Sequence, residues 1–272
     1  MKTQQLLKSL TTKDAQAMYS AYYPLKPDHV LAETLEALLQ TDVSYIENIR
    51  DFYNSAILLR YPNEATIKAA FLNQVLFKQQ KDITVFELPV GGSRVDLCKI
   101  NGSSIAYEIK TKYDNLNRLG KQLADYQKVF EQVYVICSTQ HVDAVKKSVP
   151  PGCGIFLYSY DKKYHFEKIC ESTQSMSLNS AYQLGLFRKA ELAKYFPSIA
   201  HFSKTEAIKT ILEECSFDEI NSRFKEMLKN RFSRQWSFLA QHHQEIYAID
   251  YQWFYHNNTP PQIVYGTDRR KC

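Results

Sequence analysis

The sequence lacks the features that mark secreted, zinc-binding and membrane-spanning proteins. No apolar run reaches the ~20 residues that a membrane helix needs, and the first residues lack the apolar core of a signal peptide. Isolated thiols without a disulfide framework are typical of a reducing compartment. We therefore expect a cytoplasmic protein with no membrane contact. None of the six cysteines forms a CxxC pair or lies beside a histidine cluster: Cys98, Cys137, Cys153, Cys170, Cys215 and Cys272.

The length and charge of the chain limit the size of its core and the kinds of partner it can bind. The chain has 272 residues, of which 44% are hydrophobic and 23% charged, an ordinary balance for a globular protein that buries a substantial core. The formal net charge of +5 is mildly basic. That charge is compatible with a nucleic-acid partner and does not by itself establish one.

The apolar patterning predicts an α/β fold with helical regions on both sides of a central core. Residues 1–60 have helical patterns, and Asn63 caps a further helix that runs to residue 80. In the C-terminal part, Ile220, Phe224 and Leu228 form the apolar stripe of another helix. Strands and helices then alternate, and the crossover helices indicate parallel pairing at one end of a mixed sheet. The strands are expected at 83–88, 93–100, 104–110, 133–138 and, as the last strand, 154–160, with helices at 116–132 and 140–149.

The change of pattern along the chain suggests three segments. We predict an N-terminal helical region at 1–60, a core at 61–170 and a C-terminal helical region at 176–272. Ser203 with Glu206 and Ser216 with Glu219 are capping boxes that mark helix starts in the last segment.

One hairpin carries charged residues where apolar residues would pack better. On the strand "SIAYEIK", Glu108 and Lys110 project to the same face, and a turn at 101–103 lets Asp96 approach Glu108. Two carboxylates that meet repel each other unless a cation intervenes, and Mg²⁺ takes oxygen ligands of this kind, with Mn²⁺ as a substitute. Lys110 would then orient a water molecule or stabilise the charged transition state, and the residues leave both roles open.

These residues resemble the PD-(D/E)xK motif of restriction-endonuclease-like nucleases, with Val95 where the motif often has Pro. The string "GGSRVD", followed by "YEIK" and "DNLNRLGKQLADY", is similar to a largely uncharacterised bacterial subfamily of that superfamily. The similarity covers roughly residues 60–140, and the surrounding pattern makes it more specific than a bare D…ExK match.

The resemblance implies a restriction-endonuclease-like core and a metal-dependent nuclease that hydrolyses phosphodiester bonds in DNA. Asp96, Glu108 and the Ile109 carbonyl would bind the metal, and Lys110 would be catalytic. Two further groups are implied. Glu64 matches the additional acid that the first core helix often supplies, and Gln122 with Tyr126 resembles the Q-xxx-Y pattern of RecB-like members.

Several of these residues also have ordinary structural explanations. Glu64 is equally explained as a first-turn acid that the helix dipole favours. Arg94 either contacts phosphate or pairs with Glu87 across the hairpin. Glu87 is either an acid that supports the metal ligands or, as we favour, half of a surface pair. Tyr126 fits the core as well as a nucleic-acid contact, and Asp125 is expected on a solvated face.

A basic segment at 222–236, "SRFKEMLKNRFSRQW", is a second candidate for nucleic-acid contact. It is either a surface that follows phosphates, or an amphipathic helix whose aromatic residues pack inside and whose basic residues are solvated; for the aromatic residues we favour packing. Its basic residues are Arg223, Lys225, Lys229, Arg231 and Arg234.

Three functions stay open, and one of them is a helical partner-binding protein whose basic C-terminal segment does the binding. The chain is expected to be an active nuclease or, alternatively, a catalytically inactive module of the same fold that binds nucleic acid or a partner protein. A homodimer or a partner protein held through the helical regions is compatible with both.

Overall fold

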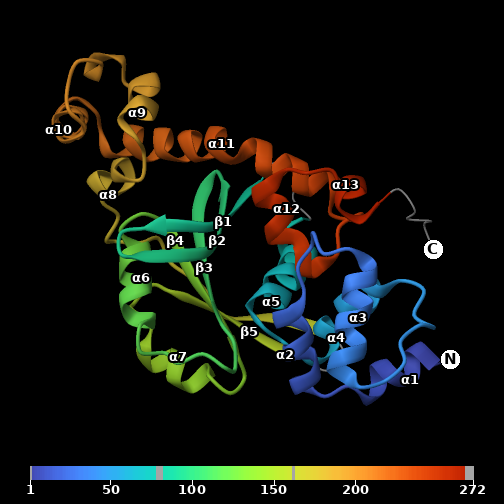
Figure 1. The fold of residues 1–272 in the computed structure, drawn as a ribbon. Coiled ribbons are helices and arrows are strands. Elements are labelled where there is room, and N and C mark those ends of the chain that lie inside the picture. The colour runs from blue at the N-terminus through green and yellow to red at the C-terminus, as the bar shows by residue number, and fades with distance from the viewer. Residues whose placement is uncertain (1, 78–81, 161–162, 267–272) are drawn as a thin grey trace. The chain divides into compact units, whose positions relative to one another are not determined.

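The chain folds into two compact units that are each discontinuous in sequence. The computed structural model describes residues 2–77, 82–160 and 163–266 (Figure 1). The first unit comprises Met1–Phe77, Tyr160–Tyr164 and Ser237–Cys272, and the second comprises Lys78–Ser159 and His165–Trp236.

A mixed sheet dominates the second unit, as the sequence predicted. Its order is β1-β2-β3-β4-β5-β6. The first three strands pair antiparallel, and β3, β4 and β5 pair parallel. The strands are β1 (Ile83–Val90), β2 (Ser93–Asn101), β3 (Ser103–Lys110), β4 (Gln132–Ser138), β5 (Gly154–Tyr160) and β6 (Tyr164–Cys170).

The prediction that 154–160 is the last strand was wrong, because β6 follows it. Along β6 only Tyr164 is buried, and most of the other side chains are exposed. A strand with so little apolar surface gives a weak sequence signal. The turn between β2 and β3 is where the sequence placed it, with Gly102 at φ 63°, a backbone conformation that glycine adopts without steric cost.

Two crossover helices create the parallel half of the sheet. α6 (Leu119–Gln127) joins β3 to β4, and α7 (Val142–Ser148) joins β4 to β5. Leu119, Leu123 and Tyr126 of α6 are buried in one core with Val133 and Val135 of β4. This packing places α6 on the sheet face that carries the even-numbered side chains of β3.

The C-terminal helices complete the second unit. The predicted capping box of Ser203 and Glu206 is present, and Ile220, Phe224 and Leu228 form the expected buried stripe. The helices are α8 (Ser180–Gly185), α9 (Lys189–Tyr195), α10 (Lys204–Glu214) and α11 (Phe217–His242), with a 3₁₀ turn at Pro197–Ile199.

A buried carboxylate fastens α11 to the sheet. Glu131 accepts hydrogen bonds from Asn221 Nδ2 at 2.8 Å and Lys225 Nζ at 2.9 Å, both on α11. Its other oxygen accepts from the backbone N–H of Ser104 at 2.5 Å. Burial alone would raise the pKa of Glu131, but the bonds from Lys225, Asn221 and Ser104 lower it below the ordinary value of 4.5. The charged carboxylate is therefore the form that the fold stabilises.

The first unit is helical. Arg50, nearly fully buried, binds Asp28 at 2.6 Å and the Pro24 carbonyl at 2.8 Å, which ties the loop before α3 to α4. Among the described residues, no helix is long and apolar enough to cross a membrane. The elements are α1 (Lys2–Ser9), α2 (Thr12–Ala21), α3 (Asp28–Leu39), α4 (Ile49–Arg60), α5 (Glu64–Phe71), a π-helix (Leu72–Leu76), a 3₁₀ turn (Ala248–Asp250), α12 (Tyr251–Asn257) and α13 (Pro261–Tyr265).

Asn63 caps α5 as predicted. Its side chain accepts from the Thr66 N–H at 3.0 Å, and Thr66 Oγ1 accepts from the Asn63 N–H at 3.0 Å. The sequence predicted one regular helix through residue 80. The helix instead changes to π geometry at Leu72, and residues 78–80 of the prediction lie outside the described part of the chain.

The Glu131 network predicts an acid-sensitive stability. Glu131→Gln should lower the free energy of unfolding by about 2 kcal/mol at pH 7, because the half-buried Lys225 ammonium loses its counter-charge. Because the folded pKa is depressed, this contribution is full above the unfolded pKa and disappears as the pH falls through the folded value. Urea unfolding at pH 7 and pH 3.5 measures both effects. The control is Glu171→Gln, an exposed acid. Equal losses in the two variants at pH 7 would contradict the assignment.

Candidate functional site

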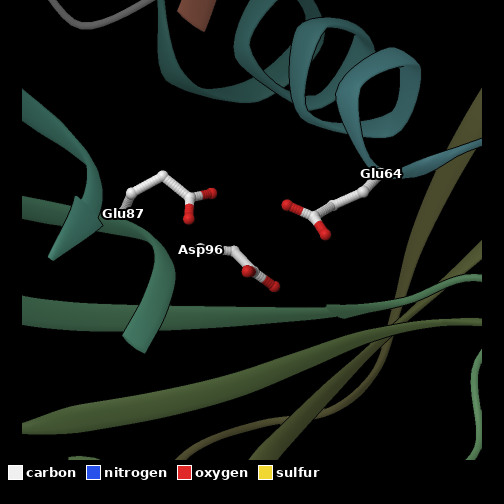
Figure 2. A group of neighbouring side chains, drawn as sticks. All are labelled: Glu64, Glu87 and Asp96. Atoms are coloured by element: carbon white, nitrogen blue, oxygen red, sulfur yellow. The ribbon is translucent and has the colours of Figure 1, made fainter. Parts of the chain in front are cut away.

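Two acids lie opposite each other in the β1–β2 hairpin. The hairpin pairs Phe86 with Leu97 and Leu88 with Val95, so Glu87 and Asp96 occupy the row between these pairs. Figure 2 shows both carboxylates projecting from their strands. The two residues offer ligand oxygens within 4.8 Å of each other. Like charges directly opposite in a sheet destabilise it, so this row requires positive charge nearby.

The backbone is strained at this row. Glu87 has φ 54°, in the left-handed region, which costs a residue with a side chain on the order of 1–3 kcal/mol. The side-chain alternation also shifts there, since Val85 and Leu88 both enter the same core. On β2, Val95 and Cys98 show the same shift. The hairpin therefore bends at the two acids.

Asp96 joins this row to β3. The backbone pairing between β2 and β3 ends at Leu97 and Tyr107. Beyond that point the carboxylate of Asp96 accepts the backbone N–H of Ile109 at 2.6 Å. The Asp96 side chain thus supplies the acceptor for a strand N–H. The bond holds the buried Asp96 against Ile109, the residue that follows Glu108 in sequence.

Glu108 and Lys110 form the second part of the candidate site, together with two residues of α6. Lys110 Nζ donates to Glu108 Oε1 at 2.7 Å and to Gln122 Oε1 at 3.0 Å. Tyr126 Oη lies 2.7 Å from Glu108 Oε2 and 2.6 Å from the Arg94 carbonyl oxygen. The predicted i,i+4 placement of Gln122 and Tyr126 on one helix face therefore brings both to the sheet.

Tyr126 is a hydroxyl donor at ordinary pH. Burial first, and the neighbouring Glu108 carboxylate second, raise the pKa of Tyr126 far above its usual value of 10. Tyr126 is fully buried, which agrees with the core alternative and leaves no face for nucleic acid in this structure. Its contact with Glu108 makes it a positioning residue for that acid.

The metal ligands implied by the resemblance do not all meet in one cluster. Among the described residues, Glu108 does not join Glu87 and Asp96 in a group of acids whose oxygens lie within 4.8 Å. Ile109 is buried, and its N–H holds Asp96. Glu64, drawn with Glu87 and Asp96 in Figure 2, is the first residue of α5 and belongs to the first unit. There it pairs with Lys68 at 2.5 Å, and its metal role stays a prediction.

Sequence reasoning underrated Glu87. The predicted ion pair between Arg94 and Glu87 is present, and the Arg94 side chain is 65% exposed. The prediction that this is a surface pair was wrong for Glu87, whose side chain is only 10% exposed. The signal was available, since a hairpin turn at 91–92 places residue 87 opposite residue 96.

Asp125 also differs from its prediction. It is half-buried rather than on a solvated face, and it accepts from Ser93 Oγ at 2.7 Å and Lys121 Nζ at 2.9 Å. Burial opposes its charge, but these two hydrogen bonds lower the pKa of Asp125. Asp125 thereby holds the tip of the β1–β2 hairpin on α6.

The basic segment on α11 is partly used inside the fold. Lys225 binds Glu131, and Arg231 binds Glu191 with contacts of 2.6 and 2.7 Å. Arg223 contacts Glu226 at 3.4 Å, and Arg223 and Arg234 are exposed, while Lys229 is half-buried. The aromatic residues follow the packing interpretation, since Phe224 and Trp236 are buried.

A family model described as Bacteriophage P4 protein cII matches residues 58–253. The chain belongs to this family. The matched region of this cII family chain contains every candidate site residue, from Glu64 to Arg234.

Protein cII of Enterobacteria phage P4 is 29% identical over 165 residues, which cover 58% of this chain and 62% of that protein. The alignment thus spans less than two thirds of that cII protein. No solved structure matches the chain.

The strain at Glu87 gives a direct prediction. Glu87→Gly should be more stable than Glu87→Ala by about 1 kcal/mol, because both remove the carboxylate and only glycine adopts a positive φ without cost. Both variants lose the ion pair with Arg94, so the difference between their stabilities reports the backbone strain alone. Urea midpoints of the two variants measure the difference, and equal midpoints would show that position 87 is unstrained.

Proposed function

We propose that this cII family chain is a metal-dependent nuclease with a restriction-endonuclease-like core, acting on phosphodiester bonds of DNA. The observation that carries the proposal is the acidic row of Glu87 and Asp96, beside Glu108 and Lys110 on the next strand. Two acids that face each other across a strained bend repel, and a bound cation would offset that repulsion.

The proposed donors are all oxygen atoms, which is the chemistry that a hard divalent cation takes. Asp96 and Glu108 supply carboxylate oxygens, the Ile109 carbonyl is the further ligand implied by the resemblance, and Glu64 is the proposed additional acid. Oxygen donors of this kind suit Mg²⁺, with Mn²⁺ as a substitute. When bound, the ion would polarise a phosphate oxygen and lower the pKa of its water.

The protein's own groups position the reacting centre. Lys110 is held between Glu108 and Gln122, which fixes its ammonium group at the C-terminal end of β3. From there it would orient the attacking water or stabilise charge on the phosphate. Tyr126 fixes Glu108 from the helix side, so its effect on catalysis acts through that carboxylate.

The basic residues divide into two classes under this proposal. Arg223, Lys229 and Arg234 of α11, with the exposed Arg94 of the hairpin, are the candidates for phosphate contact. Lys225 and Arg231 serve the fold through Glu131 and Glu191. A cytoplasmic location, and self-association or a partner protein held through the helical regions, belong to the same proposal.

The hydrogen bonds of Glu108 favour the alternative, a nuclease-like module that binds nucleic acid without cleaving it. Both oxygens of Glu108 are engaged, one by Lys110 and the other by Tyr126. A metal ligand would have to release one of these bonds. Binding that persists in EDTA, with no product in Mg²⁺ or Mn²⁺, is the result expected for that alternative.

Cleavage assays test the nuclease directly. Plasmid and short single-stranded DNA, with RNA as a comparison, are incubated with the full chain in Mg²⁺ or Mn²⁺. Asp96→Asn, Glu108→Gln and Lys110→Ala should each lower the rate by about 10²-fold or more, as expected when a positioned acid–base group is removed. Glu213→Gln, an exposed acid on α10, is the control. Wild-type rates in Asp96→Asn or Lys110→Ala would refute the proposal.

Metal binding is measurable without turnover. Mn²⁺ at 100 times its dissociation constant should stabilise the wild-type fold by about 2.7 kcal/mol. Asp96→Asn should lose most of that gain, whereas Glu213→Gln should keep it. Thermal melts with Mn²⁺ and with EDTA provide the comparison, and an identical metal shift in Asp96→Asn would exclude Asp96 as a ligand.

A further inference from the structure

The first unit contains an open cleft that the nuclease chemistry does not use. It has a volume of about 750 Å³ and is lined from α2, α5 and α12, which Figure 1 labels. This size is in the range of small-molecule sites. Its walls combine aromatic rings with side-chain amides: Tyr19, Tyr23 and Trp253, with Asn63, Gln252 and Asn257.

The aromatic wall is held in place by contacts within the same unit. Trp253 Nε1 donates to Tyr23 Oη at 3.3 Å, so the two rings hold each other. Tyr22 and Tyr265 both donate to the buried Asp250, at 2.8 and 2.6 Å, which fastens α2 and α13 to the start of α12. Tyr23 is nevertheless 49% exposed, so a flat ligand has a ring face to stack on.

One polar atom at the cleft lacks a partner. Asn63 is only 7% exposed, and its Oδ1 is used to cap α5. Its Nδ2 has no hydrogen-bond partner in the part of the chain that the structure describes. A buried N–H group without an acceptor costs about 1–3 kcal/mol, so a ligand whose acceptor reaches this Nδ2, which is itself buried in the structure, regains that energy.

The charge of the lining narrows the chemistry of the ligand. Among the described residues neither Lys nor Arg lines the cleft, and Glu64 and Asp250 do. A phosphate group is therefore disfavoured. An ammonium ligand would suit the acids but offers Asn63 no acceptor. A nucleobase offers both a flat face for the rings and carbonyl or ring-nitrogen acceptors for an amide donor.

We propose that this cleft binds one unstacked nucleobase, so that the chain acts on single-stranded or locally unpaired nucleic acid. The proposal rests on the proposed function, because the bound base would belong to the nucleic acid that the nuclease cleaves. Unstacked bases are commonly read by stacking on aromatic side chains and by hydrogen bonds to their edges.

The test uses the full chain in EDTA with a short DNA strand that carries one 2-aminopurine, whose fluorescence falls when it stacks. Single-stranded DNA should show quenching on binding, and the fully paired duplex should not. Trp253→Ala and Tyr23→Ala should each weaken binding about tenfold, within the range for one lost stacking contact. Trp253→Phe, which keeps an aromatic ring, should keep most of the wild-type affinity for the DNA strand. The control is Tyr113→Ala, an exposed tyrosine of the second unit.

Asn63→Ser probes the amide donor separately. Serine keeps an acceptor for the Thr66 N–H, so α5 remains capped and the melting temperature should hold. The quenching affinity should fall several-fold, because the shorter side chain removes the amide donor.

Equal quenching by wild type, Trp253→Ala and Tyr23→Ala, or by strand and duplex, would overturn the cleft proposal. Because EDTA removes the metal, the quenching assay does not depend on cleavage. Quenching in EDTA, together with no cleavage in Mg²⁺ or Mn²⁺, supports the cleft and refutes only the nuclease. Cleavage without quenching refutes only the cleft.

Discussion

The bend of the β1–β2 hairpin at Glu87 and Asp96 is the constraint on which the candidate site depends. The bend turns Leu88 and Val95 into the core and leaves the two acids facing each other. Asp96 then takes the Ile109 N–H where strand pairing stops. This one bond sets the Asp96 carboxylate against the Glu108–Lys110 stretch of β3.

The helix α6 supplies the other boundary of the site. Its apolar face, with Leu119 and Leu123, packs on the sheet, and this packing carries Gln122 and Tyr126 to Lys110 and Glu108. Asp125 then pins the hairpin tip to the same helix through Ser93. Ordinary hydrophobic burial thus positions the polar groups, and the polar groups in turn specify how the hairpin sits on the helix.

Much of this arrangement could be predicted from sequence. The hairpin, the parallel crossovers, the Asn63 cap and the stripe ending at Leu228 follow from local periodicity and turn chemistry. The positive φ of Glu87 could not be predicted, because hydrophobic alternation treats a glutamate on a strand only as a polar position. Strand β6 was missed because a strand with one buried residue has too little apolar contrast.

The same limit applies to interactions between distant segments. Glu131 gathers donors from Ser104, Asn221 and Lys225, and no pattern around residue 131 announces partners 90 positions away. The basic residues of α11 look alike in sequence, yet Arg231 and Lys225 are committed to internal acids. Local sequence gives the charge of these residues, and only the fold decides which charges remain for a ligand.

The chain passes between its two units at 77–78, 159–160, 164–165 and 236–237, and α11 contributes residues to both. No single cut therefore separates one unit from the other. A truncation near residue 176 would strip the sheet of the helix that Glu131 anchors and also remove α12 from the first unit. Neither unit can therefore be gained or lost by fusing or deleting one contiguous gene segment. We expect the two units to evolve together.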